Sequence, residues 1–596
     1  MNIELILKES IHNAFNELFD HDLPVNDIKI QPTNKEFKGT HTFVTFQYLR
    51  ISKRGPEETG NLIGEFLKNN SGIIEKFNII KGFLNLELND STWLKVLESD
   101  FKDPFWQHDN KKNQKMMVEY SSPNTNKPLH LGHLRNNFLG YAVSNILEAS
   151  GYDVQKVTLI NDRGIHICKS MVAYQKFSNG ETPESSGMKG DHLVGKYYVF
   201  FDKEYKKEVA ELIEEGLSKE EAAKKAPILI EAQNILIKWE EKDEDTINLW
   251  KRLNGWVYDG FDVTYEDIGV SFDKIYYESE VYLLGKDIVE EGLRKGIFYK
   301  ESDGSVWADM REEGLDKKLL LRADGTAVYM TQDLGTADLK YHNYPFNQSI
   351  YVVGNEQDYH FDMLFKILQK LERPYANNLH HLSYGMVDLP SGKMKSREGT
   401  VVDADDLVEE MILTAKAQTE ELGKIDDFNE NELNELYKIL ALGALKYFLL
   451  KIDPQKRMMF NPQDSIQFQG NTGPFIQYTY ARISAIVRKA NELEIDISRI
   501  NIPPDMELHE TEKELIMTIN YYGREVEDAA AGYAPSIIAN YCYELAKSYN
   551  RFYTEVSIFN VENNKIRDFR VILSYFAANT IKNGMSLLGI KVPERM

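Results

Sequence analysis

The distribution of hydrophobic positions divides this chain of 596 residues into an α/β part and a long helical part. A helix-like pattern over 3–19 is followed by short alternating apolar stretches such as THTFVTFQYL and GFLNLEL. Alternation at every second residue predicts half-buried strands, whereas a period near 3.6 predicts an amphipathic helix. The first 108 residues are therefore predicted to be a small α/β domain, which ends in the polar linker WQHDNKKNQK at 106–115.

A strand–helix–strand unit is predicted after the linker. MMVEYSS at 116–122 is typical of a strand, and a loop rich in Pro and Asn leads into a helical pattern over 128–150. Pro128 is favourable as a first helical residue because its missing N–H would have no partner there. VQKVTLI at 154–160 predicts the next strand. Two strands joined by a helix form a βαβ unit, which predicts a parallel sheet.

The later pattern indicates a helical insertion, a return to the sheet and a helical bundle. Residues 201–252 are rich in Glu, Lys and Ala and predict a charged helical insertion. QSIYVVG at 348–354 and HLSYGMVDL at 381–389 predict further strands. From about 405 onward the pattern is helical. The predicted domains are 1–108, 109–404 and 405–596.

Composition adds few constraints but excludes some classes of protein. With 42% hydrophobic and 27% charged residues, the chain is ordinary for a globular protein. Its start, MNIELILKES, lacks the positive charge of an export signal, and the apolar run ALGALKYFLL is short and contains Lys446. We therefore expect a cytoplasmic protein with no membrane partner. Cys168 and Cys542 cannot form a four-cysteine zinc site, so no metal ligands are predicted.

Net charge and motifs point in different directions. Asp and Glu number 93 against 70 Lys and Arg, which gives a net charge of -23. This argues mildly against a nucleic-acid binder, because phosphate contacts require Lys and Arg. A large acidic enzyme can still concentrate positive charge in a local groove.

The strongest local pattern is a His-x-Gly-His cluster at the start of the first predicted helix of the βαβ unit. His130 and His133 are three residues apart and therefore share a helix face. A helix N-terminus attracts anions, and Gly132 lets a ligand approach the backbone closely. The cluster suits a nucleoside triphosphate. Metal ligation and two surface histidines remain as alternatives at this point.

A second pattern, GMVDLPSGKMKSREGTVV at 385–402, follows a predicted strand. Its basic residues Lys393, Lys395 and Arg397 suit a departing pyrophosphate, on which negative charge accumulates during transfer. A solvated basic turn is the alternative.

Together these motifs resemble those of class I aminoacyl-tRNA synthetases. HLGH resembles their HIGH signature, and KMKSREG resembles their KMSKS loop. The flanks are similar to arginyl-tRNA synthetases in SSPN at 121–124, in Lys127 and in Leu134–Arg135. The resemblance covers nearly the whole chain in the right order, through GFLNLEL, YMTQD, VVGNEQDYHF, QGNTGPFIQYTYARI and LLGIKVPERM.

The resemblance implies both a fold and a reaction. The implied fold is α/β: a Rossmann-type class I catalytic domain, a small N-terminal tRNA-contacting domain, and an all-helical C-terminal bundle whose anticodon-binding part covers about 470–596. The implied enzyme is an arginine–tRNA ligase. It activates L-arginine with ATP to arginyl-adenylate and transfers the arginyl group to the 3′ end of tRNA(Arg). Mg²⁺ is expected to accompany ATP, and the enzyme is expected to be a monomer.

Site residues follow from the resemblance position by position. A guanidinium pairs bidentately with carboxylates, so Glu119 and Asp333 are expected to hold the arginine side chain. The alternatives are a protein cation that pairs with Glu119 and a helix-cap role for Asp333. The implied catalytic residues are His130, Gly132, His133, Lys393, Lys395 and Lys127; ATP would contact His130, His133, His360, Met386 and Val387; arginine would contact Glu119, Ser121, Asn124, Tyr329, Asp333 and Gln357; and tRNA would contact Tyr553 and Met596.

Two departures from the family pattern leave roles open. Ser396 stands where KMSKS has its second lysine, and Lys127 could substitute for that lysine. LINDRGIHICKS at 159–170 differs from the more frequent DWGTQFG version, so we expect structural roles for its polar residues Asp162, Arg163 and His166.

Three other functions fit the sequence less well. A cysteinyl synthetase would need more cysteines for zinc, and an inactive paralogue should have lost catalytic residues. A nucleotidyltransferase that does not act on tRNA would have no use for a large C-terminal bundle.

Overall fold

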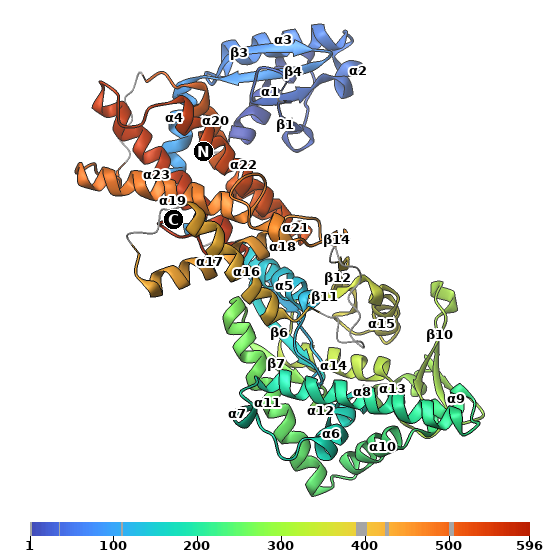
Figure 1. The fold of residues 1–596 in the computed structure, drawn as a ribbon. Helices are drawn as coiled ribbons and strands as arrows, with labels where there is room; N and C mark the ends of the chain where they lie inside the picture. The colour runs from blue at the N-terminus through green and yellow to red at the C-terminus, as the bar shows by residue number, and fades with distance from the viewer. Residues whose placement is uncertain (1–2, 35, 109–110, 389–401, 423–427, 500–505) are drawn as a thin grey trace.

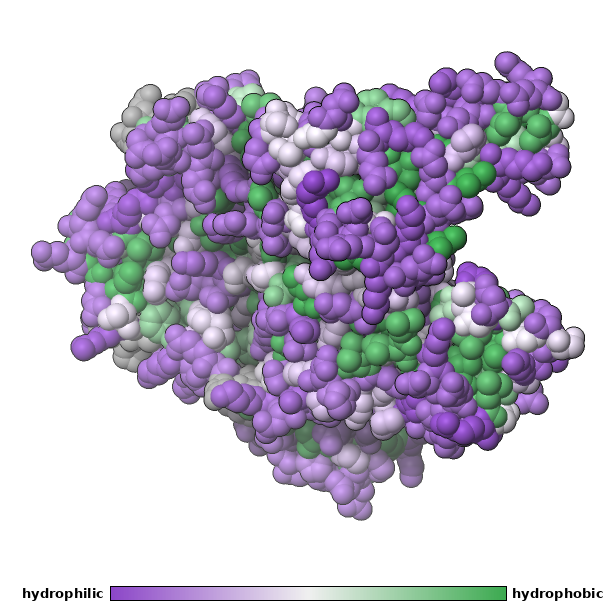
Figure 2. All heavy atoms as spheres, turned by 90° about the horizontal axis from the view of Figure 1, so that it is seen from below, coloured by the Kyte–Doolittle hydropathy of each residue, from purple (hydrophilic) through white to green (hydrophobic). Residues whose placement is uncertain are grey.

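The computed structural model describes residues 3–34, 36–108, 111–388, 402–422, 428–499 and 506–596. Three bodies follow one another through space, and the helical bundle lies between the N-terminal sheet and the central sheet (Figure 1). The face shown in Figure 2 is mostly polar, with small apolar patches between charged side chains. Among the described residues, no helix combines the length and apolarity needed to cross a membrane.

The N-terminal domain is a four-stranded antiparallel sheet with helices beside it. Helix α1 (Ile3–Phe19) has the predicted bounds and buries Leu7, Ile11 and Phe15 at intervals of four residues. The sheet order is β1-β2-β4-β3. After the sheet, α4 (Asp90–Lys102) packs against α20 (Glu510–Asn520) of the bundle. The other elements are α3 (Pro56–Asn70), β1 (Ile30–Pro32), β2 (His41–Val44), β3 (Ile74–Ile80) and β4 (Phe83–Leu88).

The central sheet has five parallel strands in the order β12-β11-β5-β6-β7. The chain enters at β5, extends to one side through β6 and β7, and then returns to the other side of β5. This reversal opens a crevice at the carboxyl ends of β5 and β11, where open α/β sheets bind ligands. The predicted Rossmann-type sheet is thus confirmed, with strands β5 (Lys115–Glu119), β6 (Asp153–Ile160), β7 (Lys274–Tyr277), β11 (Gln348–Gly354) and β12 (Leu379–Tyr384).

Two predicted boundaries differ from the structure. Helix α5 (Leu131–Ala149) begins after the predicted start at Pro128, because His130 is extended and acts as the N-cap. The predicted strand 381–389 is interrupted at Gly385. A Cβ there would lie 2.6 Å from the backbone nitrogen of Arg457, so only glycine permits this approach. The strand resumes as β13 (Val387–Asp388), which pairs with β14 (Met458–Met459).

A block of helices separates β6 from β7 and includes the predicted charged segment 201–252. The block is longer than predicted, because its helices begin at Ile165 and end at Ile268. Its helices are α6 (Ile165–Phe177), α7 (Pro183–Ser186), α8 (Gly190–Glu214), α9 (Lys219–Lys225), α10 (Pro227–Glu240) and α11 (Glu244–Ile268).

Between β7 and β11 the chain forms a small antiparallel sheet of order β10-β9-β8, flanked by helices. This part contains α12 (Glu278–Val281), α13 (Gly285–Arg294), β8 (Phe298–Lys300), β9 (Val306–Asp309), β10 (Lys317–Leu321) and α14 (Tyr329–Asn343). Helix α15 (Asp358–Lys370) follows β11.

The C-terminal part is helical, as predicted. Helix α5 packs against both the central sheet and the bundle (Figure 1). Cys168 and Cys542 are buried and form no disulfide. The helices of this part are α16 (Ala404–Leu422), α17 (Glu430–Leu450), α18 (Pro462–Ser465), α19 (Gly473–Glu492), α20, α21 (Tyr522–Gly532), α22 (Pro535–Glu555) and α23 (Asn564–Leu587).

Candidate functional site

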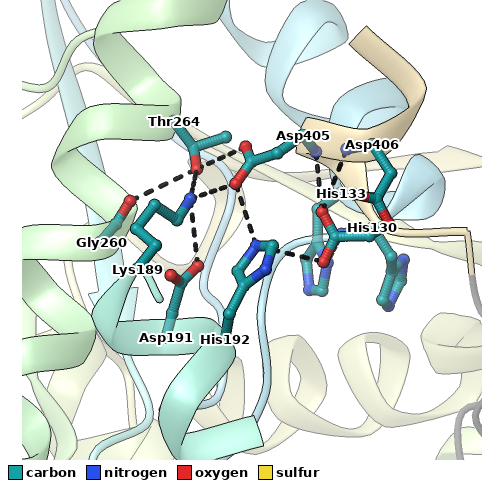
Figure 3. A network of polar contacts seen from close by, with 10 residues as sticks. His130, His133, Lys189, Asp191, His192, Gly260, Thr264, Asp405 and Asp406 are labelled. Atoms are coloured by element: carbon teal, nitrogen blue, oxygen red, sulfur yellow. Dashed lines mark hydrogen bonds and ion pairs between the residues drawn. The ribbon is translucent and has the colours of Figure 1, made fainter. Parts of the chain in front are cut away.

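The His-x-Gly-His cluster lies at the N-terminus of α5, beside the crevice of the central sheet. The N–H of Gly132 donates to Nδ1 of His130 at 3.1 Å, and the N–H of His130 donates to Nδ1 of His133 at 3.1 Å. Because an N–H needs an unprotonated acceptor, each neutral ring carries its proton on Nε2. The two ring centres are 3.9 Å apart (Figure 3).

Both imidazoles are neutral near pH 7. Burial, with a smaller contribution from Lys127, lowers the pKa of His130 to about 3. Burial also lowers the pKa of His133 well below its usual range. A neutral ring with Nε2–H is a hydrogen-bond donor, so the pair offers two donors to an anion at this helix N-terminus.

The next turn of α5 carries two buried polar residues that hold the crevice together. The guanidinium of Arg135 donates to the carbonyls of Gly385, Pro454 and Lys456 at 2.6, 3.1 and 2.9 Å. Asn136 donates to the carbonyl of Val352 at 2.7 Å and accepts the N–H of Ser121, so it joins the ends of β11 and β5. Sequence analysis named Arg135 only as part of a resemblance and missed Asn136. The polar run LRNN on a helix that is otherwise apolar was the available signal.

The carboxylate of Glu119, at the carboxyl end of β5, already has an ion-pair partner within the protein. It forms an ion pair with the ammonium group of Lys340 on α14, and both side chains are buried. Lys340 also lies over the ring of Tyr351, 5.0 Å from its centre. A guanidinium placed beside this matched pair would bury an uncompensated positive charge. The alternative left open by the sequence, a protein cation as the partner of Glu119, is therefore the arrangement in the structure.

A different carboxylate, Glu278, lies within electrostatic range of Asp333. Glu278 directly follows β7 and is 8% exposed, and among the described residues its carboxylate has no hydrogen-bond or ion-pair partner. Burial, with the negative charges of Asp162 and Asp333, raises its pKa from 4.5 to about 7 against the opposing charge of Arg163. Asp333 lies one turn after Tyr329 on α14 and accepts a hydrogen bond from Nε2 of His360 at 2.7 Å.

The two carboxylates thus form an acidic position, and Arg163, which is already paired with Glu240, offsets only part of the charge of Glu278. Glu278 lines a pocket of about 490 Å³ together with Tyr329 and Gln332. Asp333 does not cap α14, whose N-cap is Val328. Sequence analysis missed Glu278, although its place directly after the strand KIYY at the carboxyl edge of the sheet was a usable signal.

Asp162 fixes the backbone beside Glu278. Its buried carboxylate accepts the N–H and the hydroxyl of Ser279 at 2.8 and 2.7 Å, and the hydroxyl of Tyr258 at 2.8 Å. Its carbonyl accepts hydrogen bonds from two further side chains of α11. The structural role expected for Asp162 agrees with these contacts. This role bears on the site, because Ser279 directly follows Glu278 in the chain.

The neighbours of Asp162 in sequence also bind within the protein. Arg163 pairs with Glu240 at 2.6 Å and lies over the ring of Tyr282, 3.8 Å from its centre. His166 is hydrogen-bonded through Nδ1 to the hydroxyl of Tyr198 at 3.0 Å.

The other predicted ligand residues are spread around the crevice. Ser121, with φ 72°, turns the chain sharply after β5, and its hydroxyl is hydrogen-bonded to Tyr265 at 2.7 Å. Asn124 and Gln357 are exposed in the segments that follow β5 and β11, and Tyr329 is 73% exposed. Burial lowers the pKa of Lys127. Met386 is 38% exposed and Val387 is buried, while Lys393 and Lys395 lie outside the described residues.

The helical bundle has a second hollow, lined by basic and aromatic side chains. The guanidinium of Arg482 lies 5.1 Å from the ring centres of Tyr478 and Tyr553, and Lys489 lies 4.6 Å from that of Phe559. The hollow has a volume of about 780 Å³, and it brings the predicted tRNA contacts Tyr553 and Met596 together. Aromatic faces next to cations suit the stacking of single-stranded bases beside phosphates.

Three protein families match successive parts of the chain. The Arginyl tRNA synthetase N terminal domain matches residues 5–88, and the tRNA synthetases class I (R), catalytic domain, matches residues 95–461. The DALR anticodon binding domain matches residues 476–596.

Relatives of similar length carry the same name. The arginine–tRNA ligase of Amoebophilus asiaticus is 56% identical, and that of Bacteroides fragilis (strain YCH46) is 54% identical, each match covering 100% of both chains. Among solved structures, the Thermus thermophilus arginyl-tRNA synthetase matches with a TM-score of 0.78 at 23% identity, covering 100% of both chains. The Plasmodium falciparum enzyme matches with a TM-score of 0.75 at 21% identity, covering 99% of this chain and 98% of the other. These two structures support the fold.

The crevice, the basic hollow and these comparisons lead to one conclusion. The chain belongs to the arginyl-tRNA synthetase family, and it activates L-arginine with ATP and transfers the arginyl group to tRNA(Arg), releasing AMP and pyrophosphate.

Proposed function

We propose that Glu278 and Asp333 bind the guanidinium group of arginine. The observation that carries this proposal is the acidic position between β7 and α14: among the described residues, the buried carboxylate of Glu278 has no hydrogen-bond or ion-pair partner, and it interacts electrostatically with a second carboxylate, Asp333. A guanidinium supplies one positive charge and five donors in a plane, which matches two carboxylates better than a point charge does. Tyr329 at the pocket wall would pack along the plane of the group.

The other end of arginine lies toward β5 and β11 in this proposal. Asn124 and Gln357 are exposed in the segments that follow these strands and would hold the α-amino and α-carboxylate groups, with Ser121 shaping the turn between them. Glu119 then acts at a distance, by holding Lys340 and the end of α14 in place.

The arginine pocket is tested with Asp333→Asn and Glu278→Gln. Each substitution keeps the size of the side chain but turns an amide donor toward the guanidinium donors. We expect kcat/KM for arginine to fall by about 10²-fold, as loss of a charged hydrogen bond costs roughly 3 kcal/mol. ATP affinity should be retained. The matched control is Glu280→Gln, two residues beyond Glu278; if it has the same effect, or if Asp333→Asn charges arginine normally, the assignment fails.

We further propose that the histidine pair stabilises the phosphates of ATP. The carboxylate of arginine attacks the α-phosphorus in line, and pyrophosphate leaves with the bonding electron pair. The Nε2–H groups of His130 and His133 would donate to phosphate oxygens as charge shifts toward the leaving group. Lys127 and the basic residues Lys393 and Lys395 would neutralise the pyrophosphate, while Met386 and Val387 would border the nucleotide and His360 would connect it with Asp333.

The second step requires no covalent enzyme intermediate. The 2′-hydroxyl of the terminal adenosine of tRNA attacks the arginyl carbonyl, and AMP leaves. Positioning and electrostatic stabilisation carry the rate in this proposal.

Mg²⁺ is proposed to arrive bound to ATP. Among the described residues, a single group of three candidate metal ligands lies close together: Asp191, His192 and Asp405. The ammonium group of Lys189 already pairs with both carboxylates, so this group does not fit a resident magnesium ion. When Mg²⁺ is bound with the nucleotide, it supplies charge neutralisation at the phosphates.

We propose that residues 1–108 contact the body of the tRNA and that the basic hollow, within residues 470–596, binds anticodon bases. The support is the cation–aromatic lining around Tyr553 and Met596 in a chain with a net charge of -23.

We also propose that the enzyme acts in the cytoplasm as a monomer, because one chain supplies all of the proposed ligands. Light scattering should then give a mass near 68.9 kDa, and a mass twice as large would contradict the monomer.

A further inference from the structure

A cluster of charged side chains on three helices lies beside the histidine pair. Lys189 precedes α8 and forms ion pairs with Asp405 of α16 and, at 3.3 Å, with Asp191 of α8. Lys189 also donates to the hydroxyl of Thr264 on α11 at 2.5 Å, and that hydroxyl donates to Oδ1 of Asp405 at 2.9 Å. Figure 3 shows these groups converging from the three helices, with His130 and His133 on the far side of Asp405.

His192 extends the cluster to Asp403. Its Nε2 lies 3.1 Å from Oδ2 of Asp405 and 3.4 Å from Oδ2 of Asp403. Asp403 in turn accepts the backbone N–H of Asp405 at 2.8 Å and so fixes the first turn of α16. Two positively chargeable groups on the α8 side therefore meet two carboxylates at the start of α16.

The segment held in this way pairs directly with the histidine loop. The N–H of Leu131 donates to the carbonyl of Val402 at 3.2 Å, and the N–H of Ala404 donates to the carbonyl of Leu129 at 3.0 Å. His130 and Asp403 are partners in this antiparallel bridge. A shift of residues 402–404 would therefore move the backbone that carries His130.

Close packing makes the α8 side a rigid support. A Cβ at Gly190 would lie 2.0 Å from the carbonyl oxygen of Trp256 on α11, and a Cβ at Gly260 would lie 2.4 Å from Oδ1 of Asp191. On the next turn, a Cβ at Gly195 would lie 2.8 Å from Cδ of Pro128, just ahead of the histidines. Helix α8 thus touches the histidine loop at one point and holds the paired segment at another.

We propose that Lys189 and His192 are positioning residues for the activation step: they bind Asp405 and Asp403, and through the backbone pairing of 402–404 with 129–131 they hold His130 and His133 in place for ATP. This inference rests on the proposed role of the histidine pair. It assigns the cation of the cluster to Lys189 itself, because its ammonium group lies between Asp191 and Asp405. It gives the first residues of α8 a role in ATP use that arginine binding does not share.

Ionisation of the cluster supports the same arrangement. Burial tends to raise the pKa of Asp405, but hydrogen bonds from His192 and Lys189 outweigh it and lower the pKa to about 2. The hydrogen bond to Asp405 raises the pKa of His192 above its usual range, with Asp403 and Asp191 adding to the effect and burial and Lys189 opposing it. Protonated His192 binds both carboxylates, and that attachment weakens as pH rises through its raised pKa.

The test compares Lys189→Met, Asp405→Asn and the double variant by pyrophosphate exchange in the presence of tRNA. We expect kcat/KM for ATP to fall by about 10- to 100-fold in each single variant, the scale of a charge-assisted hydrogen bond, with KM for arginine nearly unchanged. The double variant should lose less than the two single losses combined, because both changes break the Lys189–Asp405 contact that they share. The matched control is Lys196→Met, which breaks an ion pair of the same helix with Glu181, of 2.7 Å, and should leave ATP use unchanged.

A pH profile separates positioning from a purely structural role. Wild-type kcat/KM for ATP should decline on the alkaline side as His192 loses its proton, and His192→Gln should lack that decline while melting at a similar temperature. Additive losses in the double variant, equal effects on ATP and arginine, or an unchanged pH profile would overturn the proposal. If Lys189→Met and His133→Ala both use ATP at the wild-type rate, the proposed role of the histidines fails. If His133→Ala is inactive and Lys189→Met uses ATP at the wild-type rate, the positioning role alone fails.

Discussion

Glu119 and Glu278 show how one type of side chain takes two roles according to what lies opposite. Glu119 ends β5 and Glu278 directly follows β7 in the same sheet, and both are buried. Glu119 faces Lys340, so its charge is matched within the fold. The pKa of Glu278 rises to about 7 because burial and the negative charges of Asp162 and Asp333 disfavour its ionised form more than Arg163 favours it. An arginine ligand would relieve this cost by bringing a positive charge.

Arginine binding is therefore expected to depend on pH. In the free enzyme, Glu278 takes up a proton as pH falls through about 7 and then no longer attracts the guanidinium. We expect kcat/KM for arginine to decrease about tenfold for each pH unit below that value, whereas kcat/KM for ATP should follow a different profile. The measurement is pyrophosphate exchange at varied arginine concentration from pH 5.5 to 8.5. A flat profile for arginine would rule out Glu278 as the titrating ligand.

The same raised pKa predicts a gain in stability when Glu278 is neutralised. The folded-state pKa lies above the ordinary 4.5, so the folded state loses stability as pH rises from about 4.5 through about 7. Glu278→Gln should therefore raise the melting temperature at pH 8 in the absence of arginine, and the gain should disappear near pH 4. Differential scanning fluorimetry at both pH values tests this, and a lower melting temperature at pH 8 would contradict it.

Replacement of one histidine of the pair should slow the activation step. Removing one transition-state donor typically costs about 10²- to 10³-fold in rate, so His133→Ala should slow arginine activation by at least about 100-fold. The loss should appear in kcat more than in KM for arginine. A control, His166→Ala, removes a histidine that binds Tyr198 outside the crevice and should retain activity. Near-normal turnover in His133→Ala would exclude the assigned role.

At the scale of elements, α5 carries most of the organisation of the site. Its N-terminus presents the histidines, its second turn fixes three strand ends through Arg135 and Asn136, and Gly140 lets it approach the ring of Tyr120. A Cβ at Gly140 would lie 2.3 Å from that ring, so the helix could not pack so closely with any larger residue.

Arg135→Lys tests the hydrogen bonds by which the guanidinium of Arg135 joins α5 to the loop before the basic segment. Lysine keeps the charge but cannot reach the carbonyls of Gly385, Pro454 and Lys456 in one plane. Each buried carbonyl left without a donor costs about 1–3 kcal/mol, so both the melting temperature and the rate of ATP use should fall. The control Arg311→Lys changes an exposed ion pair with Asp309 and should have little effect. If both variants keep the same melting temperature and the same rate of ATP use, the hydrogen bonds of the Arg135 guanidinium are dispensable.

For the whole molecule, the distribution of charge matters more than its sum. The chain has a net charge of -23, yet Arg482, Arg488, Lys489 and Arg595 surround the hollow of the bundle. Helix α5 packs against both the catalytic sheet and the bundle, so the two sites share one rigid element (Figure 1). Acidic surface elsewhere disfavours non-specific RNA contacts and leaves the hollow as an attractive region.

Arg482→Gln should weaken tRNA binding without changing arginine or ATP binding. We expect an affinity loss of about 10-fold, together with a salt dependence reduced by about one phosphate contact. Filter binding of tRNA at several salt concentrations measures both. Arg551→Gln, on the same bundle but paired with Glu514 and Glu555, is the control and should bind tRNA normally. An unchanged salt dependence in Arg482→Gln would place the anticodon elsewhere.

Local sequence patterns are sufficient to predict the order of elements, the fold class and the family. The periodicity of apolar residues predicts helix α1, the βαβ unit and the helical C-terminal part, because the spacing that defines the apolar side of each element lies within a short segment of sequence. The histidine cluster was also local: three residues at one helix start suffice to define it.

Which charged side chains form pairs depends on how distant segments of the chain pack together. Glu119 and Lys340 are separated by 221 positions, and Lys189 and Asp405 by 216, so no local pattern could pair them. Glu278 became the candidate guanidinium ligand only when the fold left its buried carboxylate without an ion pair among the described residues, within electrostatic range of Asp333 on α14. A carboxylate's role depends on its burial and its nearest opposite charge, and both are set by long-range packing.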